Sequence, residues 1–130
     1  MRASIPLDWL DVIPVPIFIL DHAGKLWHAN PSFCGIVRMR KKALLGKRVD
    51  LLLKGENNHK LLKDILDLYR GNAVIRGTYR ISFGALKAKD VILDLTPIQH
   101  PTQNRIEYVF GMVHEPERKK GLSLVQKLFR

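Results

Sequence analysis

The spacing of apolar residues along this chain changes near its middle. Between His59 and Tyr69, apolar residues recur at the i, i+3, i+4 and i+7 positions of a helix that faces a core. Three later segments instead alternate apolar and polar residues, as half-buried strands do. The pattern predicts a helix over 59–69 and antiparallel strands over 74–83, 91–96 and 106–112.

A hairpin is predicted in the first third of the chain. Pro16 cannot donate a hydrogen bond to a ladder, so the first strand begins after it, with the apolar run Ile17 to Leu20. The segment 21–25 contains Gly24, which can adopt the positive φ of a tight turn. Residues 26–29 therefore return as the second strand.

Short helices are predicted on either side of this hairpin. Asn30 is a favourable N-cap and Pro31 suits the first helical position, so a helix begins there. Residues 4–13 have apolar side chains three apart, which indicates an amphipathic helix. A further turn at 41–45 stops at Gly46.

The order of these elements predicts an α+β fold. The simplest arrangement is a five-stranded antiparallel sheet with short helices covering one face. We expect one domain over residues 1–130, with an N-terminal helix in 1–14, a core over 15–114 and a C-terminal exit or linker helix over 115–130. Helices thus flank the core at both ends.

The positive charge of the chain is unevenly distributed. Six of its ten net charges lie between Arg38 and Arg48, a stretch without acidic residues, and a second basic cluster runs from Arg118 to Arg130. Such patches can bind nucleic acid, an acidic protein surface or membrane headgroups, or can simply be solvated helix faces. Aromatic residues do not interleave with the basic ones, which argues against a nucleic-acid partner.

Composition and motifs narrow the class of protein. No apolar run approaches the ~20 residues of a membrane span, and Cys34 is the only cysteine, so an intramolecular disulfide is excluded. We expect a soluble, cytoplasmic domain. The phosphate-loop, zinc-protease and serine-hydrolase motifs are absent, so we expect no enzyme.

Several of these features together resemble the PAS domain, the sensory module of bacterial signalling proteins. The resemblance covers about residues 5–119 and depends on the Pro14 and Pro16 opening, the strand that ends at Asp21, Gly24, the Asn30-Pro31-Ser32-Phe33 helix start, Leu45-Gly46-Lys47, and Gly111. Similar proteins close with Asp-x-Thr-Glu-Arg, of which His114-Glu115-Pro116-Glu117-Arg118 keeps only Glu-Arg. The signature that couples the last strand to an output helix is therefore only partly kept.

The resemblance implies a cavity between the sheet and the helices. The candidate lining residues are Phe18 or Leu20, His28, Leu62, Leu66, Tyr69, Tyr79, Ile81, Leu93, Leu95, Tyr108 and Phe110. Plain core packing is the better explanation for most of these residues, because any folded domain needs an apolar face at regular spacing. The three tyrosines are the stronger candidates, because a few polar groups give an apolar pocket its selectivity.

The resemblance also suggests two cofactors, and the residues argue against both. Flavin-binding light sensors carry a reactive cysteine where Val49 stands here, and the Asn and Gln that contact the flavin ring are missing. Haem-binding members supply an axial histidine from the long helix, but His59 lies at its polar start, where exposure is expected. We leave the ligand unnamed and expect no metal site.

The resemblance implies a sensory or regulatory domain that relays a signal through its C-terminal helix and dimerisation. We expect a homodimer joined to an output module such as a histidine kinase, a cyclic-dinucleotide enzyme or a DNA-binding domain. The candidate dimer contacts are Leu7, Leu10, Ile13, Leu122, Val125 and Phe129. Two alternatives stay open: a ligand-free dimerisation scaffold whose cavity is filled by its own side chains, and a basic module that binds nucleic acid or an acidic surface.

Overall fold

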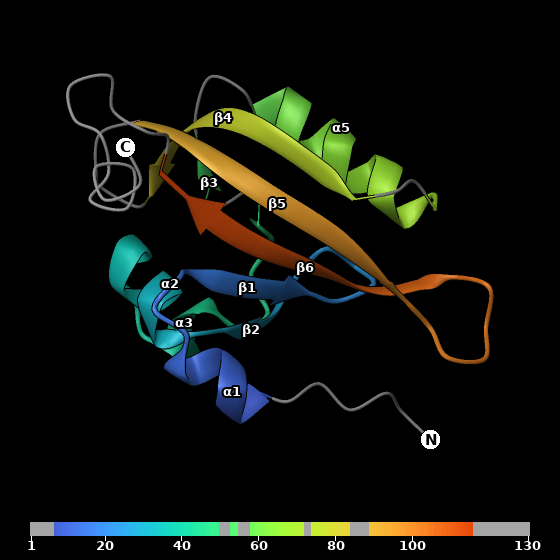
Figure 1. The fold of residues 1–130 in the computed structure, drawn as a ribbon, viewed down its shortest axis with the longest axis horizontal. Helices are drawn as coiled ribbons and strands as arrows, with labels where there is room; N and C mark the ends of the chain where they lie inside the picture. The colour runs from blue at the N-terminus through green and yellow to red at the C-terminus, as the bar shows by residue number, and fades with distance from the viewer. Residues whose placement is uncertain (1–6, 50–52, 55–57, 72–73, 84–88, 116–130) are drawn as a thin grey trace, which may run out of the picture.

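A computed structural model describes residues 7–49, 53–54, 58–71, 74–83 and 89–115 of the chain. Its strands form one antiparallel sheet in the order β2-β1-β6-β5-β4-β3 (Figure 1). The strands are β1 Ile17–Leu20, β2 Leu26–Ala29, β3 Leu53–Lys54, β4 Ile75–Phe83, β5 Lys89–Gln99 and β6 Ile106–His114. The helices are α1 Leu7–Val12, α2 Pro31–Val37, α3 Lys41–Leu44 and α5 Asn58–Tyr69.

The predicted fold class is confirmed. All five predicted strands and the long helix are present, and the predicted strand over 91–96 extends to Lys89–Gln99. The sheet gains a sixth member, β3, which pairs Leu53 with Phe83. Two residues are too few for an alternating pattern, so the sequence did not predict β3. Of the predicted exit helix over 115–130, only Glu115 lies within the described residues.

The two faces of the sheet carry separate apolar clusters. α5 covers one face, which we call the inner face, and its cluster includes Phe18, Phe33, Tyr79 and Leu93. α1 covers part of the other, outer face and buries Leu10 there against Ile17, Ile19 and Tyr108. In Figure 1 the outer face is turned to the viewer, with α1 below β1 and β2 and with α5 behind β4.

The predicted dimer contacts on the first helix point into the protein. Leu10 is buried, and Leu7 and Ile13 pack against the same outer-face cluster. The solvent-facing apolar residues of α1 are Trp9, 74% exposed, and Val12, 81% exposed. The prediction assigned the buried stripe of this amphipathic helix to a partner, whereas its own sheet covers that stripe. Leu122, Val125 and Phe129 lie outside the described residues.

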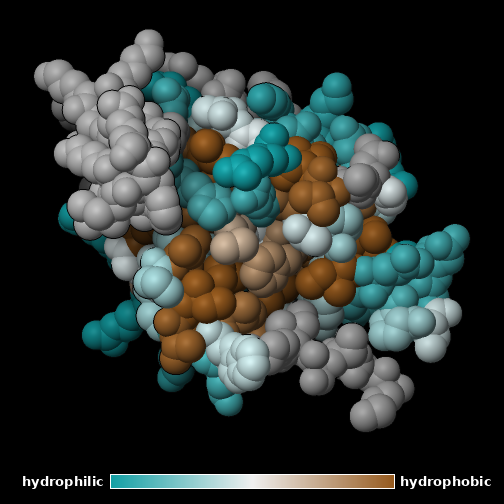
Figure 2. Space-filling view, viewed as in Figure 1, coloured by the Kyte–Doolittle hydropathy of each residue, from teal (hydrophilic) through white to brown (hydrophobic). Residues whose placement is uncertain are grey.

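The rest of the outer face is partly apolar and partly charged. Figure 2 shows hydrophobic side chains gathered at its centre, where Ile98, Phe110 and Met112 pack beside the α1 cluster. Across the neighbouring strands, Asp94 lies 3.3 Å from the Arg76 guanidinium and 2.9 Å from His114 Nε2. Cross-strand pairing of this kind neutralises the charges locally.

The Asn30 side chain connects four segments of the N-terminal half. Its Oδ1 accepts hydrogen bonds from the backbone N–H groups of Ile17, at 2.9 Å, and Phe33, at 3.0 Å. Its Nδ2 donates to the carbonyl oxygens of Leu10, Ile13 and Val15. Asn30 is completely buried. The predicted N-cap is therefore confirmed, and the same side chain also holds α1 and the following linker.

A glycine in β6 makes room for an aromatic ring on β1. Gly111 pairs with Phe18, and a Cβ added to Gly111 would lie 2.3 Å from the Phe18 ring. Phe18 in turn contacts Phe33 on α2, with ring centroids 5.2 Å apart. Gly111 therefore sets the depth to which the Phe18 ring enters the core.

We predict that Asn30→Asp destabilises the domain by about 3 kcal/mol or more. The carboxylate cannot donate, so the carbonyls of Leu10, Ile13 and Val15 lose their donor and a charge is buried. Urea denaturation monitored by circular dichroism measures the change. A loss of only about 1 kcal/mol, as expected for an isolated helix cap, would contradict this interpretation.

We predict that Gly111→Ala destabilises the domain by about 1–3 kcal/mol, because the added methyl group overlaps the Phe18 ring. Gly35→Ala is the matched control, since nothing lies within 4 Å of its Cβ position in α2. Alanine is the better helix former, so this control leaves stability equal or higher. Equal thermal unfolding midpoints for the two variants would refute the close contact.

Candidate ligand-binding site

A cleft of about 340 Å³ lies between α5 and the β1–β2 turn. Apolar side chains of α5 form one wall, and the turn and the residues preceding β3 form the other. The lining residues are His22, Ala23, Gly24, Arg48, Val49, Leu62, Ile65, Leu66 and Tyr69. The cleft is mainly apolar in residue type, with His22 and Arg48 as its ionisable members.

Local hydrogen bonds hold the turn side of this cleft. Asp21 Oδ1 accepts from the backbone N–H groups of Ala23, at 2.9 Å, and Lys25, at 3.0 Å. Gly24 has φ +78°, a left-handed conformation that favours glycine. The Asp-x-x-Gly sequence therefore forms the turn that was predicted and shapes the rim of the cleft.

The amphipathic pattern of α5 determines which of its side chains form the opposite wall of the cleft. Leu61, Ile65 and Leu68 are buried against the sheet. Leu62, Leu66 and Tyr69 each follow one of these residues by one position on the helix and line the cleft. Leu66 is 54% exposed, so the cleft is open to solvent on this side.

Tyr69 connects α5 to the turn. Its hydroxyl donates a hydrogen bond to the backbone carbonyl oxygen of Asp21. Burial raises the pKa of this hydroxyl well above its usual range, and the negative charge of Asp21 raises it further. Tyr69 therefore stays a neutral hydrogen-bond donor at physiological pH, at the edge of the cleft.

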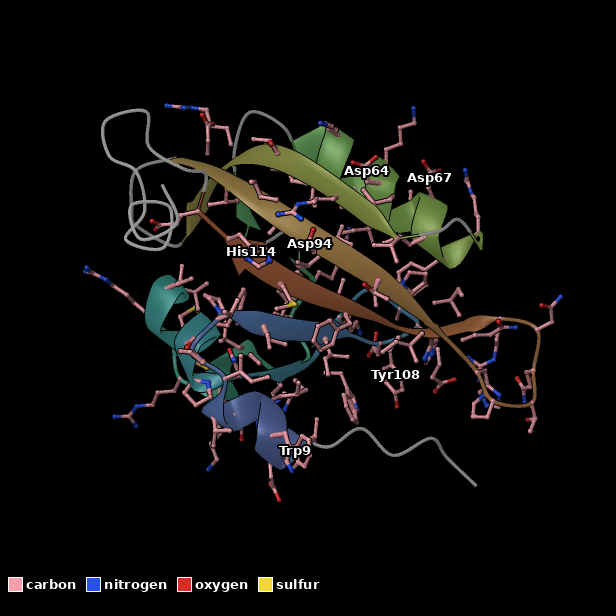
Figure 3. The ribbon with its side chains drawn as sticks, viewed as in Figure 1. Trp9, Asp64, Asp67, Asp94, Tyr108 and His114 are labelled. Atoms are coloured by element: carbon pink, nitrogen blue, oxygen red, sulfur yellow. The ribbon has the colours of Figure 1, made fainter. Side chains whose placement is uncertain are left out.

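Tyr79 connects the same helix to β4. Its side chain is fully buried, and its hydroxyl donates a hydrogen bond to Asp64 Oδ2 on α5. Burial raises the pKa of this hydroxyl well above its usual range, and the Asp64 bond adds to the shift. Figure 3 shows Asp64 and Asp67 on α5, above β4. Tyrosine hydroxyls thus tie α5 at its C-terminal end, through Tyr69, and in its middle, through Asp64.

The structure places the predicted pocket residues in different parts of the domain. Leu62, Leu66 and Tyr69 line the cleft. The members that are fully buried in the inner-face core are Phe18, Leu20, Tyr79, Leu93 and Leu95. Ile81 belongs to β4, but its side chain lies outside the described residues.

The expectation that His28, Tyr108 and Phe110 share the inner face is wrong. His28 is buried and its Nε2 lies 3.0 Å from Asp11 on α1. Tyr108 and Phe110 belong to the outer-face cluster. Alternation shows which residues of a strand share a face, but it does not show which face that is.

The residues that sequence reasoning missed come from the turn and the segment before β3. His22, Ala23, Gly24, Arg48 and Ile65 line the cleft but were not assigned to it. A backbone bridge between Lys25 and Arg48 brings the two segments together. Isolated bridges leave no periodic signal in a sequence. Val49 was compared with a flavin-binding cysteine position, and it does line the cleft, as an apolar side chain.

The comparison with haem-binding members depends on His59, and the comparison with flavin-binding members depends on Val49. The side chain of His59 lies outside the described residues. Among the described residues, no group of three His, Cys, Asp or Glu side chains is placed to hold a metal ion. Within the same residues, no helix combines the length and the apolar character needed to cross a membrane.

Comparison with known proteins identifies the family. A family profile described as the PAS fold matches residues 10–120. The chain belongs to the PAS fold family. A search of curated proteins found no match.

Solved structures agree with this fold. The LOV protein of Rhodobacter sphaeroides has 21% identity and a TM-score of 0.70, with 85% of this chain and 64% of that chain covered. A PAS domain from Colwellia psychrerythraea has 13% identity and a TM-score of 0.73, covering 85% and 92%. The PAS domain of the Cronobacter turicensis RpfR quorum-sensing receptor, in complex with BDSF, has 10% identity and a TM-score of 0.67, covering 81% and 96%.

These identities show the shared fold alone. This PAS domain spans 64% of the length of the Rhodobacter sphaeroides LOV protein. The evidence for a ligand site in this domain therefore comes from the geometry of its own cleft.

We predict that the stability of this PAS domain falls as pH rises above about 10, the usual tyrosine pKa in an unfolded chain. The folded state keeps the Tyr79 proton longer than the unfolded state does, so unfolding releases protons and is favoured at high pH. Tyr79→Phe should reduce this slope, with Tyr69 responsible for part of the remainder. Urea denaturation at several alkaline pH values measures it, and an unchanged slope would contradict the assignment.

Proposed function

We propose that this PAS domain is a sensory module that binds a small, mainly apolar molecule in the cleft between α5 and the β1–β2 turn. The observation that carries the proposal is the combination of an apolar wall, formed by Val49, Leu62 and Ile65, with polar groups at the rim. Small-molecule sites are commonly built in this way. A volume of about 340 Å³ suits a ligand of modest size.

The chemistry of the rim favours a ligand with a polar or anionic end. Arg48 contributes a guanidinium and His22 an imidazole, while Tyr69 contributes a hydroxyl. The RpfR receptor PAS domain, solved in complexes with BDSF and with C12:0, supports a ligand site in this fold. We propose a carboxylic acid with an apolar chain as the ligand class.

The relay follows from the two tyrosine hydrogen bonds. A ligand between α5 and the turn competes with or strengthens the bond from Tyr69 to Asp21. Because Tyr79 ties the same helix to β4, a shift of α5 reaches the sheet. Ligand binding then favours one packing of α5 against the sheet, and the chain beyond Glu115 carries this preference to an output module.

We further propose that the domain is a regulatory part of a cytoplasmic signalling protein and acts without catalysis. The output module would be a histidine kinase, a cyclic-dinucleotide enzyme or a DNA-binding domain. A homodimer would form through the solvent face of α1, where Trp9 and Val12 are exposed. Trp9 points away from the sheet (Figure 3). The free thiol of Cys34 fits a reducing compartment.

The second candidate is a ligand-free dimerisation scaffold. Its support is the filling of the inner-face core by the domain's own aromatic side chains, because Phe18, Phe33 and Tyr79 are completely buried. In this alternative, the space beneath α5 is occupied by packing alone, and the domain contributes only an interface.

We predict that Leu62→Trp weakens binding of medium-chain fatty acids by about tenfold or more, equivalent to about 1.4 kcal/mol, because the indole fills the cleft. Calorimetric titration of the purified domain measures the affinity. Thr78→Trp is the control, since Thr78 is an exposed residue of β4 that does not line the cleft. Equal weakening by both variants would refute the site.

Native mass spectrometry distinguishes the two candidates. A small molecule retained by the purified domain, or binding of the fatty acids, supports the sensor. Dimers that carry no retained molecule and bind none of the acids would instead establish the scaffold.

A further inference from the structure

The stretch from Arg38 to Arg48 carries six exposed basic residues, and we call the surface of this stretch the basic surface. Its members are Arg38, Arg40, Lys41, Lys42, Lys47 and Arg48, and each is exposed. The sequence from residue 22 to residue 49 contains no Asp or Glu. The positive charge of this region is therefore not diluted by acidic neighbours along the chain.

Buried apolar anchors hold the backbone that carries the basic surface. Val37, Leu44 and Val49 are buried in the inner-face core, with exposed fractions of 3%, 0% and 2%. The Gly46 N–H donates to the Leu26 carbonyl oxygen, and the Leu26 N–H donates to the Lys47 carbonyl oxygen, both at 2.8 Å. The charges are thus presented by a backbone bonded to the edge of the sheet.

The turn between α2 and α3 brings the two halves of this surface together. Arg38 has φ 56°, a left-handed conformation, and its backbone N–H donates to the Cys34 carbonyl oxygen at the end of α2. Arg40 is the N-cap of α3. Three residues, Arg38, Met39 and Arg40, therefore separate the helices, and two of them are basic, so the positive charge continues from this turn into α3.

Ion pairing differs between this surface and the arginines of the sheet. Arg76 pairs with Asp94 and Arg80 with Asp90 across β4 and β5, and Arg105, directly before β6, pairs with Glu107. Within the described part of the chain, no acidic side chain pairs with the first five basic residues of the basic surface. A negatively charged partner would supply the opposite charge that these basic residues lack.

An exposed leucine lies among these charges. Leu45 is 40% exposed, directly after α3 and between Lys42 and Lys47. An exposed apolar side chain that basic residues flank in the sequence is suited to the headgroup region of an anionic bilayer, where the cations bind lipid phosphates and carboxylates while the apolar group enters the interface.

Other anionic partners fit this surface less well. Single-stranded nucleic acid is bound by basic residues together with aromatic stacking residues, and no aromatic residue occurs from Arg38 to Arg48. A second copy is also a poor match, because each copy carries the same net charge of +10 and the strand acids are already paired. We infer that the basic surface docks this PAS domain onto an anionic phospholipid bilayer.

The experiment measures binding of the whole chain to vesicles of phosphatidylserine and phosphatidylcholine in about a 1:3 ratio, and to pure phosphatidylcholine vesicles. Binding is measured by sedimentation at about 0.15 M ionic strength. The Debye length is then about 8 Å, so the salt screens long-range attraction. Binding to the anionic vesicles alone is expected. Equal binding to both vesicle types, or binding to neither, would overturn the inference.

Two pairs of variants localise the interaction. Lys41→Glu with Lys42→Glu should weaken vesicle binding by about tenfold or more. Lys63→Glu with Arg70→Glu makes the same change of charge on α5 and directly after it, and should weaken binding by less than about threefold. If the two double variants behave alike, only the net charge matters, and the basic surface is not the docking site.

Leu45→Ser distinguishes a bilayer from a nucleic acid, because it leaves the charge unchanged and removes the apolar contact. It should weaken vesicle binding, whereas Val74→Ser, at a residue 59% exposed before β4, should not. A DNA duplex tested in parallel should bind more weakly than the anionic vesicles. Tighter binding to the duplex, with no effect of Leu45→Ser on the vesicles, would assign the surface to nucleic acid and refute the bilayer.

Discussion

The hydrogen bonds of the Asn30 carboxamide hold together the N-terminal half of this domain. One planar group bonds to the backbone of β1, to the first turn of α2 and to three carbonyl groups of α1 and the linker that follows it. A buried amide stabilises a structure only when its donors and acceptors all find partners, because an unsatisfied buried group costs the full loss of its hydration. The position of α1 on the outer face therefore depends on Asn30, as does the direction in which α2 leaves the hairpin. The basic surface follows α2 in the chain, so its position also depends on Asn30.

A second constraint operates on the other side of the sheet. α5 is held at one end by Tyr69, which bonds to the turn, and in its middle by Asp64, which accepts from Tyr79 on β4. The cleft lies along this doubly tied helix. Binding in the cleft therefore acts on hydrogen bonds that join the helix to the hairpin and to the sheet. A sensor needs a contact of this kind, since a ligand shifts a conformational equilibrium only through differential interactions with the two states.

The cleft and the basic surface share one segment but present different chemistry. Arg48 lines the cleft and Val49 forms part of its apolar wall, whereas Lys41 and Lys42 face solvent from α3. Leu44 and Val49 anchor this segment in the core. A movement of α5 against Val49 would therefore act on the same segment that carries the basic surface. Ligand sensing and docking to a bilayer, proposed separately, would therefore involve neighbouring residues of one short stretch.

The sequence by itself determined the order and type of the elements, because hairpin, capped helix and strand alternation are local signals of a few residues each. Asn30 and Pro31 predicted the start of α2, and the apolar spacing over 59–69 predicted α5, although the buried residues of this helix are Leu61, Ile65 and Leu68 and Leu66 is 54% exposed. It included Leu62, Leu66 and Tyr69 among the pocket candidates, and these three line the cleft. Only the tertiary structure decided which face of the sheet each strand pattern serves, which is why His28, Tyr108 and Phe110 were assigned to the wrong side. The two-residue strand β3 and the bridge from Lys25 to Arg48 also came from the structure. The physical reason is that periodicity records which residues of one element share a face, whereas the contact between two distant segments depends on how the whole chain packs.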